Sequence, residues 1–234
     1  MTQTVRLCAV TRLEKRAFLE QAWLARSLRS IPKAKRPRIH LHAANSGSGA
    51  LGLPEVYNQV LAECDDDDIL AMVHDDVYIH EWLLVDRLRE ALQHYDVVGV
   101  AGSAAPDYRH PSWLLRFDEA LNPTGPQPDV CPSGAVGHQD PQTPVVSFYG
   151  ETPKPCLLLD GLFMAVAVGR VRAAGLQFDE RFRFHCYDID FCRSATQANL
   201  RIGTWPLNLT HQSAGNFASE TFQTAARTYL EKWR

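Results

Sequence analysis

Short apolar runs alternate with expected helices through the first part of the chain. We expect a strand at each of the runs VRLCAV, IHLHA, ILAMV and VVGVA, at residues 5–10, 39–43, 69–73 and 97–101. Helices are expected between them, over residues 13–28, 54–64 and 81–94. A strand as uniformly apolar as ILAMV is buried on both faces, as in parallel sheets covered by helices. The order therefore predicts an α/β fold with a mixed, mostly parallel sheet flanked by helices.

The carboxyl ends of these strands are the expected place for a ligand. In open α/β sheets, ligands bind in the crevice beyond the carboxyl ends of the strands. This rule points to Thr11 and Arg12, to the flexible loop that follows Ala43 and contains Asn45, and to residues 74–77.

The stretch from Ser103 to Cys156 breaks the alternating pattern. It holds ten of the chain's fourteen prolines and shows little periodicity. It also contains the aromatic residues Tyr108, Trp113, Phe117, Phe148 and Tyr149. A loop of this length in a compact domain is either functional or disordered, and a disordered tract would lack the aromatic residues. We therefore expect an irregular, proline-rich excursion that lies over the active site.

Regular structure is expected to resume after this excursion. The segment LLLDGLFMAVAV is apolar apart from its central Asp-Gly, and a short helix is expected at 171–174. Residues 178–190 lead into a helix, a late strand is expected over 202–209, and an amphipathic helix over 219–234. A chain of 234 residues is about the size of one large domain, so we expect a single domain over 1–234.

Composition and charge exclude several classes of partner. The formal net charge is −3 and no basic stripe can be found, so we expect no nucleic acid partner. The short basic segment 33–38 is interpreted as a solvated loop. The six cysteines match no zinc spacing and favour a reducing compartment. We see no signal peptide and no stretch of about 18 apolar residues. We therefore expect a cytoplasmic protein without a transmembrane segment; the oligomeric state does not follow from the sequence.

The triplet His74-Asp75-Asp76 is the strongest candidate for a functional site. It follows the apolar run ILAMV directly, so its acids lie at a strand's carboxyl end. Adjacent carboxylates near apolar residues are costly unless a cation neutralises them. Mg²⁺ and Mn²⁺ suit carboxylate oxygens, and phosphates complete their coordination. The alternative for the triplet is a solvated acidic turn. We interpret the separate four-acid run Asp65–Asp68 as such a turn.

Three further features are candidates for chemistry. Asp188 and Asp190 stand just before an expected helix, where one acid can cap the helix and the other can serve as a general base. Asp160-Gly161 places an acid inside a run of twelve otherwise apolar residues. Burying a charged group there is unfavourable unless it serves a function, although the pair also suits a strand end or a bulge. His211 ends the late strand, and a lone histidine gains a role only if it reaches the same metal as the triplet.

Five segments together resemble the family 2-like glycosyltransferases of the GT-A fold. Within these, the similarity is closer to the short bacterial group related to a streptomycin-biosynthesis protein. The segments, in order, are VYNQVL (56–61), ILAMVHDDVYI (69–79), LDGLFMAV (159–166), FDERFRFHCYDIDFC (178–192) and LTHQSAGNF (209–217). The resemblance covers most of the chain except the proline-rich excursion.

The resemblance implies a nucleotide-sugar donor and a divalent ion, Mn²⁺ or Mg²⁺. His74-Asp75-Asp76 falls at the family's DxD motif, so Asp76 would bind the metal, and His74 or Asp75 would face the nucleotide. This chain departs from the motif, because a histidine replaces the first acid. Thr11 and Arg12 fall where the family binds the base and ribose. Residues 1–102 would then form the nucleotide-binding half, and 157–234 the acceptor and catalytic half.

The resemblance also implies the catalytic residues. Asp188, with Tyr187, falls where inverting members carry Glu-Asp, so Asp188 would be the general base. His211 falls where some GT-A enzymes place a third metal ligand. The donor sugar and the acceptor would contact Asp160, Gly161, Tyr187 and Asp190.

The implied reaction is a single displacement that transfers a sugar to a hydroxyl of a saccharide or another acceptor. The sugar, the nucleotide and the acceptor do not follow from the sequence. Two alternatives are a nucleotidyltransferase of related fold and a non-catalytic nucleotide-sugar-binding module. The first usually carries a glycine-rich loop after strand one, where this chain has Thr-Arg-Leu-Glu-Lys-Arg. The histidine in the DxD position leaves the second open.

Overall fold

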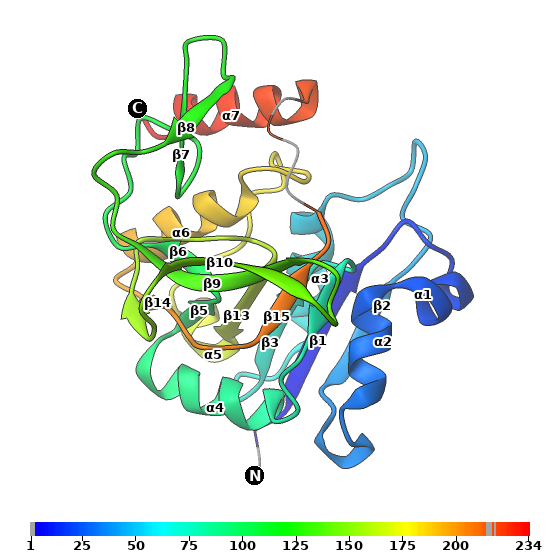
Figure 1. The fold of residues 1–234 in the computed structure, drawn as a ribbon. Coiled ribbons are helices and arrows are strands. Elements are labelled where there is room, and N and C mark those ends of the chain that lie inside the picture. Colours follow the sequence, from blue (N-terminus) through cyan, green and yellow to red (C-terminus); the bar gives the residue numbers. More distant parts are fainter. Residues whose placement is uncertain (1–2, 214–216, 218) are drawn as a thin grey trace.

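The strands and helices are taken from a computed structural model that describes residues 3–213, 217 and 219–234 (Figure 1). The strands are β1 (Val5–Val10), β2 (Arg38–His42), β3 (Ile69–Val73), β4 (Val77–Ile79), β5 (Val97–Gly99), β6 (Ala101–Ser103), β7 (Leu115–Phe117), β8 (Pro123–Pro126), β9 (Pro132–Gln139), β10 (Pro144–Gly150), β11 (Lys154–Pro155), β12 (Leu158–Leu159), β13 (Phe163–Ala167), β14 (Ile202–Thr204) and β15 (Leu209–His211). The α-helices are α1 (Lys15–Gln21), α2 (Trp23–Ser30), α3 (Leu53–Glu63), α4 (Leu84–His94), α5 (Val168–Ala173), α6 (Tyr187–Gln197) and α7 (Glu220–Lys232). A short 3-10 helix covers Lys33–Lys35.

The larger sheet of the described chain has the strand order β11-β14-β5-β13-β3-β1-β2. β1 pairs in parallel with β2 and β3, and β5 pairs in parallel with β14. β13 runs antiparallel between β3 and β5, so β1, β2, β3, β5 and β14 all point in one direction. The predicted α/β fold with a mixed, mostly parallel sheet is confirmed.

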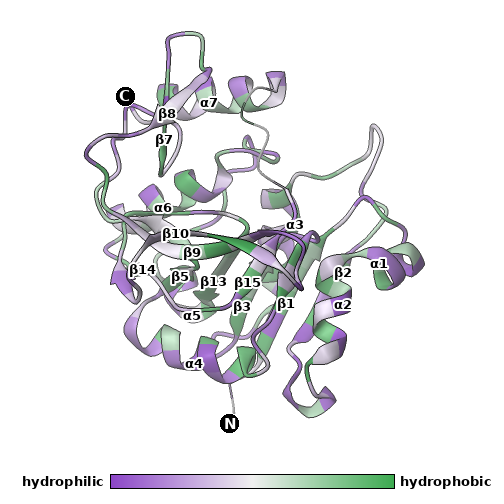
Figure 2. Cartoon of the chain, in the orientation of Figure 1, coloured by the Kyte–Doolittle hydropathy of each residue, from purple (hydrophilic) through white to green (hydrophobic). Residues whose placement is uncertain are grey.

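Burial explains why these segments form the centre of the sheet. All five residues of β3 are buried, and the strand lies between β1 and β13. α3 packs against β1, and α4 packs against β5 and β13. Figure 2 shows hydrophobic residues along the central strands and hydrophilic residues on the outer faces of α2 and α4. Removing such apolar surface from water, at about 25 cal/mol per Å², is the main force that stabilises the sheet.

A second sheet, which we did not predict, has the order β12-β6-β9-β15-β4, with β10 paired to β9. The antiparallel pair β9–β10 lies within residues 103–156, so the expectation of an irregular excursion is wrong for this part. The expected strand 97–101 is divided at Val100 between β5 in the first sheet and β6 in the second. The expected strand 202–209 is likewise two strands, β14 and β15, in different sheets. Apolar runs do not show where a chain changes sheets.

Two smaller expectations also change. The expected helix over 13–28 is two helices, because Ala22 adopts an extended conformation between α1 and α2. The acidic run 65–68 is a turn, as predicted, but it is not wholly solvated. Asp68 is buried, and its carboxylate accepts a hydrogen bond from Arg6 Nε at 2.6 Å. An ion pair therefore replaces the solvent that we expected around this acid.

The chain passes from one sheet to the other at two places that hold candidate site residues. His74–Asp76 connect β3 to β4, and Asp160–Leu162 connect β12 to β13. The His74 N–H donates to the Leu162 carbonyl at 3.1 Å. Because β13 is antiparallel to β3, with Phe163 opposite Val73, the two crossings lie at the same edge of the first sheet.

The cysteines and helices bear on two expectations from composition. All six cysteines are free thiols, and five of them are buried. Burial of thiols agrees with the apolar segments in which they occur. Of the helices that the structure describes, none has the length and apolarity needed to span a bilayer.

Gly134 provides a test of the second sheet. It lies in β9 at φ +110°, and a Cβ there would lie 2.0 Å from the Val100 carbonyl oxygen. Gly125 in β8 has a similar φ of +119°, with nothing within 4 Å of the Cβ position. We expect Gly125→Ala to lower the free energy of unfolding by about 1–2 kcal/mol through backbone strain. Gly134→Ala should lose at least about 2 kcal/mol more, because overlap is added to strain. Urea denaturation measures both, and equal losses would contradict the close packing of β6 on β9.

Candidate functional site

A cavity of about 600 Å³ lies where the two crossings meet. Val10 and Val73, the last residues of β1 and β3, line it. The cavity therefore lies beyond the carboxyl ends of these strands, where open α/β sheets bind ligands. The predicted site residues that line it are His74, Asp75, Asp76, Asp160, Gly161, Tyr187, Asp188 and His211.

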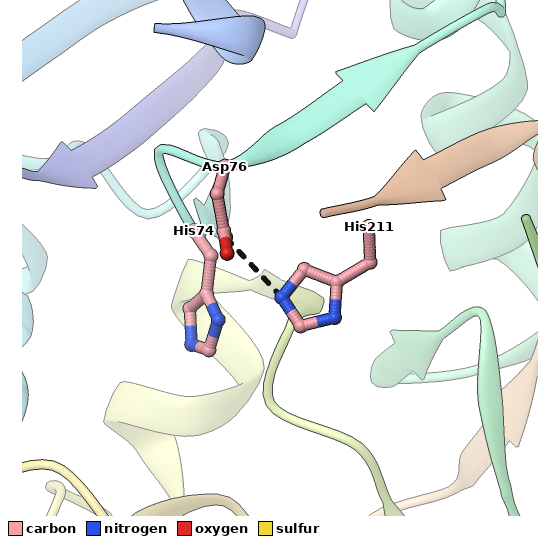
Figure 3. A group of neighbouring side chains, drawn as sticks. All are labelled: His74, Asp76 and His211. Carbon is pink, nitrogen blue, oxygen red and sulfur yellow. Dashed lines mark ion pairs between the residues drawn. The ribbon is translucent and has the colours of Figure 1, made fainter. Parts of the chain in front are cut away.

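His74, Asp76 and His211 form a cluster that could hold a metal ion. One potential ligand atom from each lies within 4.8 Å of the other two. Figure 3 shows the three side chains converging from the connection between β3 and β4 and from the end of β15. His211 Nε2 lies 3.2 Å from the Asp76 carboxylate and 3.1 Å from the Ser213 hydroxyl. The predicted approach of His211 to Asp76 is thus present in the structure.

The shifted pKa values of Asp76 and His74 suit metal ligands, whereas His211 would have to release a proton to bind a metal. Burial raises the pKa of Asp76, but the hydrogen bond from His211 and the charges of both histidines outweigh it, and the pKa falls to about 2. Burial lowers the pKa of His211, but its hydrogen bond to Asp76 and that carboxylate's charge bring the pKa above its usual value. Burial and repulsion from His211 lower the pKa of His74. Asp76 is therefore ionised and His74 neutral at pH 7, the forms in which these side chains bind metals.

A chain of hydrogen bonds fixes the ring of His74. The Tyr187 hydroxyl donates to the Gly161 carbonyl at 2.8 Å and lies 3.0 Å from His74 Nε2. A tyrosine hydroxyl has one proton to donate, so His74 Nε2 must carry the ring proton and donate it to Tyr187. Nδ1 of His74 then keeps its lone pair, as a metal ligand requires.

Asp188 faces the cavity from the first turn of α6. Its carboxylate accepts a hydrogen bond from the Gly161 N–H at 2.8 Å. Burial raises the pKa of Asp188 to about 7, and the charge of Asp160 adds to this effect, although backbone hydrogen bonds oppose it. A carboxyl group with a pKa near the working pH is well suited to accept a proton from a substrate hydroxyl.

Gly161 allows α6 to approach the crossing between β12 and β13. A Cβ at this position would lie 2.5 Å from the Tyr187 hydroxyl and 3.0 Å from Asp188 Cβ. Cys186, the residue just before α6, adopts a left-handed conformation with φ 63° at the start of the helix. Close packing against α6 therefore requires a glycine at position 161.

Asp160 is held on both of its carboxylate oxygens. Trp113 Nε1 donates to Oδ2 at 2.9 Å, and the Leu162 N–H donates to Oδ1 at 3.0 Å. Trp113 comes from the excursion and packs edge-on against Tyr149, with ring centroids 5.1 Å apart. Both aromatic residues line the cavity. This part of the excursion thus lies over the site, as its aromatic content indicated.

Three residues predicted to bind the nucleotide are outside the described lining of the cavity. Thr11 is buried, and its hydroxyl donates to the Asp75 carboxylate at 2.5 Å. Arg12 is exposed. Asn45 bonds the backbone of Leu51 through both ends of its side-chain amide and so shapes its own loop. Thr11 orients a residue of the site, and direct contact of these three with a nucleotide stays a prediction.

Asp190 is buried and bonded to residues at the end of α7. It is 1% exposed, and its carboxylate accepts hydrogen bonds from Lys232 Nζ at 2.9 Å and Trp233 Nε1 at 2.8 Å. These bonds attach the end of α7 to α6. Asp190 is not among the described residues that line the cavity, so its position gives no support to the expected contact with an acceptor or sugar.

Sequence reasoning missed several residues that line the cavity. His138 on β9 lies opposite His211 on β15 in the strand register, and both face the cavity. Phe184 is 53% exposed and stacks on His74 with ring centroids 6.0 Å apart. Phe222 reaches the cavity from α7. Nothing in the local sequence marks His138, because only the unpredicted second sheet brings it here. Part of the segment LTHQSAGNF, residues 214–216, lies outside the described residues.

Comparison with solved structures identifies the type of fold. GalNAc-T7, crystallised with UDP, GalNAc and Mn²⁺, matches with a TM-score of 0.57 and 10% identity over 97% of this chain and 48% of that chain. Residues 1–349 of S. aureus TarS match with a TM-score of 0.47 and 14% identity, over 90% of this chain and 60% of that one. A197 from STIV matches with a TM-score of 0.47 and 11% identity, over 89% and 85%. No protein-family model and no curated protein sequence matches the chain.

The class defined by this comparison is the GT-A type of α/β fold, as predicted. At 10% identity the likeness to GalNAc-T7 is one of fold. This chain spans about half the length of that protein. The chemistry of the site must therefore be argued from this chain's own residues.

Asp188 makes the stability of the fold depend on pH. Its pKa of about 7 in the folded state lies above the value of about 4 expected for an unfolded chain. Below about pH 4 the carboxyl is protonated in both states and does not affect stability. Between about pH 4 and pH 7 it ionises in the unfolded chain but stays protonated in the folded protein, so the free energy of unfolding falls as the pH rises. Each pKa unit is worth about 1.4 kcal/mol, so the full difference is about 4 kcal/mol. Relative to Asp188→Asn, the wild type should lose about 3 kcal/mol of this stability between pH 4.5 and pH 8, because the unfolded chain is already partly ionised at pH 4.5. Urea denaturation at both pH values checks this, and parallel profiles would refute the burial argument.

Proposed function

We propose that this protein is a Mn²⁺-dependent, inverting glycosyltransferase that moves a sugar from a nucleotide-sugar donor to an acceptor hydroxyl. The observation that carries the proposal is the presence, in one cavity, of the His-Asp-His cluster and of a buried carboxyl with a pKa of about 7. The fold supports it by analogy, because GalNAc-T7 was crystallised with UDP, a sugar and Mn²⁺. Membership of the bacterial group that the sequence resembles stays a prediction.

The donor atoms of the cluster fit Mn²⁺ better than Mg²⁺. Mg²⁺ prefers a shell of oxygen atoms, whereas imidazole nitrogens suit transition metals. The cluster offers two imidazoles and one carboxylate. We therefore assign His74 Nδ1, Asp76 and His211 as ligands, with diphosphate oxygens of the donor completing the shell. When bound, the ion would offset the negative charge of the leaving diphosphate.

In the proposed arrangement, the nucleotide would lie in the part of the cavity next to the end of β1. Asp75, which lines the cavity, is oriented there by the Thr11 hydroxyl. Leu53, at the start of α3, also lines the cavity. Asp75 would accept hydrogen bonds from the nucleotide, as a carboxylate with one oxygen already engaged can.

Asp188 is the proposed general base. It would take the acceptor's hydroxyl proton as that oxygen bonds to the anomeric carbon. The bond from this carbon to the diphosphate oxygen breaks at the same time, and the diphosphate leaves with the electron pair. Asp160 has both oxygens engaged by N–H donors, which suits a fixed charge that stabilises positive charge on the sugar. A single displacement of this kind inverts the anomeric configuration.

Metal binding should depend on His211. Mn²⁺ should raise the melting temperature of the wild type, because a ligand that binds only the folded state stabilises it. Replacing a ligand by alanine, His211→Ala, should weaken Mn²⁺ binding by about 100-fold or more, since changes to outer partners of metal ligands already cost 10–100-fold. Calorimetric titration measures the affinity. His94→Ala, a change at an exposed histidine outside the cavity, is the control. An unchanged Mn²⁺ affinity in His211→Ala would remove this residue from the site.

Transfer should depend on Asp188. A thermal-shift screen of UDP-, GDP- and dTDP-sugars with Mn²⁺ identifies the donor, and release of nucleoside diphosphate follows turnover. Asp188→Asn should lower kcat by about 10²–10⁴-fold, the usual contribution of a general base. Asp129→Asn, at an exposed acid outside the cavity, should keep full activity. Full activity in Asp188→Asn would exclude it as the base, and a wild type that binds donors without turnover would favour the non-catalytic binding module.

A further inference from the structure

The lining of the cavity combines acids and histidines with large apolar side chains. Its acids and the His-Asp-His cluster belong mainly to the crossings between the sheets and to the start of α6. Six further lining side chains are aromatic or aliphatic, namely Trp113, Leu114, Leu115, Phe184, Phe217 and Phe222. We call this set the apolar wall. Among the described residues that line the cavity, none is lysine, arginine, asparagine or glutamine.

Polar atoms of the apolar wall are already bonded within the protein. Trp113 Nε1 donates to Asp160. The Ser112 hydroxyl oxygen accepts hydrogen bonds from the N–H groups of Leu114 and Leu115, at 3.1 and 3.0 Å. The surface that Trp113, Leu114 and Leu115 leave for a ligand is therefore hydrocarbon, from one indole ring and two leucine side chains.

The other side of the apolar wall is held by α7. Phe222 on α7 stacks with Phe117 on β7 at 5.2 Å between ring centroids, and His185 lies edge-on to Phe222 at 5.6 Å. Figure 1 shows the β7–β8 hairpin beside α7, above α6 and far from β1 and β2. Phe184 adds an aromatic face that is 53% exposed. Covering aromatic surface that is exposed in a cavity with an apolar ligand removes it from water, which favours binding.

We infer that the acceptor is an uncharged hydroxyl compound with a mostly apolar body, such as a phenol or an alicyclic alcohol. The inference rests on the proposed function and names the substrate class of the same site. A saccharide carries hydroxyls on every side, and those that lie against the apolar wall would lose water without gaining hydrogen-bond partners, which is unfavourable. An anionic acceptor would face Asp160 and Asp188 with no lysine or arginine in the described lining to balance its charge.

Equilibrium binding tests this inference separately from transfer. The protein, with Mn²⁺ and UDP present, is titrated by calorimetry with naphthol and cyclohexanol, and with methyl glucoside and maltose. Naphthol should bind at least about ten-fold more tightly than either sugar. Leu114→Gln and Phe184→Ala should each weaken naphthol binding about ten-fold, as expected for lost apolar contact in a pocket. The matched controls, Val145→Gln and Phe148→Ala, change β10 residues that are 55% and 71% exposed outside this cavity, and they should leave binding unchanged.

The outcomes separate this inference from the proposed function. Sugars that bind as tightly as naphthol, or cavity variants that behave like their β10 controls, overturn the apolar acceptor. Transfer to saccharides but not to phenols overturns it as well, while the glycosyltransferase proposal stands. Naphthol binding that only the cavity variants weaken supports it, even where no donor is turned over and the proposed function alone fails.

Discussion

The pairing of strands on either side of the two crossings determines where every polar side chain of the site can lie. β3 and β13 are antiparallel, so the residue after β3 must neighbour the residues before β13, and the hydrogen bond from His74 to Leu162 joins them. β4 then pairs with β15, with Val77 opposite His211. This register brings His211 to Asp76 from a point 135 positions later in the chain. The metal cluster is thus a consequence of strand register between two sheets rather than of a local motif.

The same arrangement brings four acids to one cavity, and each carboxylate has different hydrogen-bond partners. Asp75 is bonded by Thr11 and Asp76 by His211, while Asp160 receives two N–H donors. Asp188 also accepts the Gly161 N–H, but burial and the charge of Asp160 outweigh this bond and raise its pKa to about 7. Clustered carboxylates whose surroundings differ in this way separate into fixed charges and one group that exchanges a proton.

The sequence predicted the parts of this molecule that depend on local pattern. The uniformly apolar run ILAMV identified β3, and its carboxyl end identified the place of the site. Spacing alone could not show that residues 97–103 and 202–211 each serve two sheets, because every strand in them is only three residues long. His138 was missed for the same reason. The bonds of Asp190 to Lys232 and Trp233 were not foreseen, since these partners lie at the end of α7, whose packing no sequence pattern reveals.

Helix α6 connects the proposed base to the apolar wall. Its first turn presents Asp188 to the cavity, and Asp190 on the same helix binds the end of α7, which carries Phe222. One turn further, the Arg193 guanidinium lies 4.3 Å from the ring centroids of both Tyr108, in the excursion, and Trp233. Cation–π contacts of this kind contribute about 0.5–2 kcal/mol each. The end of α7 and the early part of the excursion are therefore both attached to the helix that holds the base. Substitutions in α6 away from the cavity should alter acceptor binding through the position of the wall, whereas the metal cluster depends on the sheets.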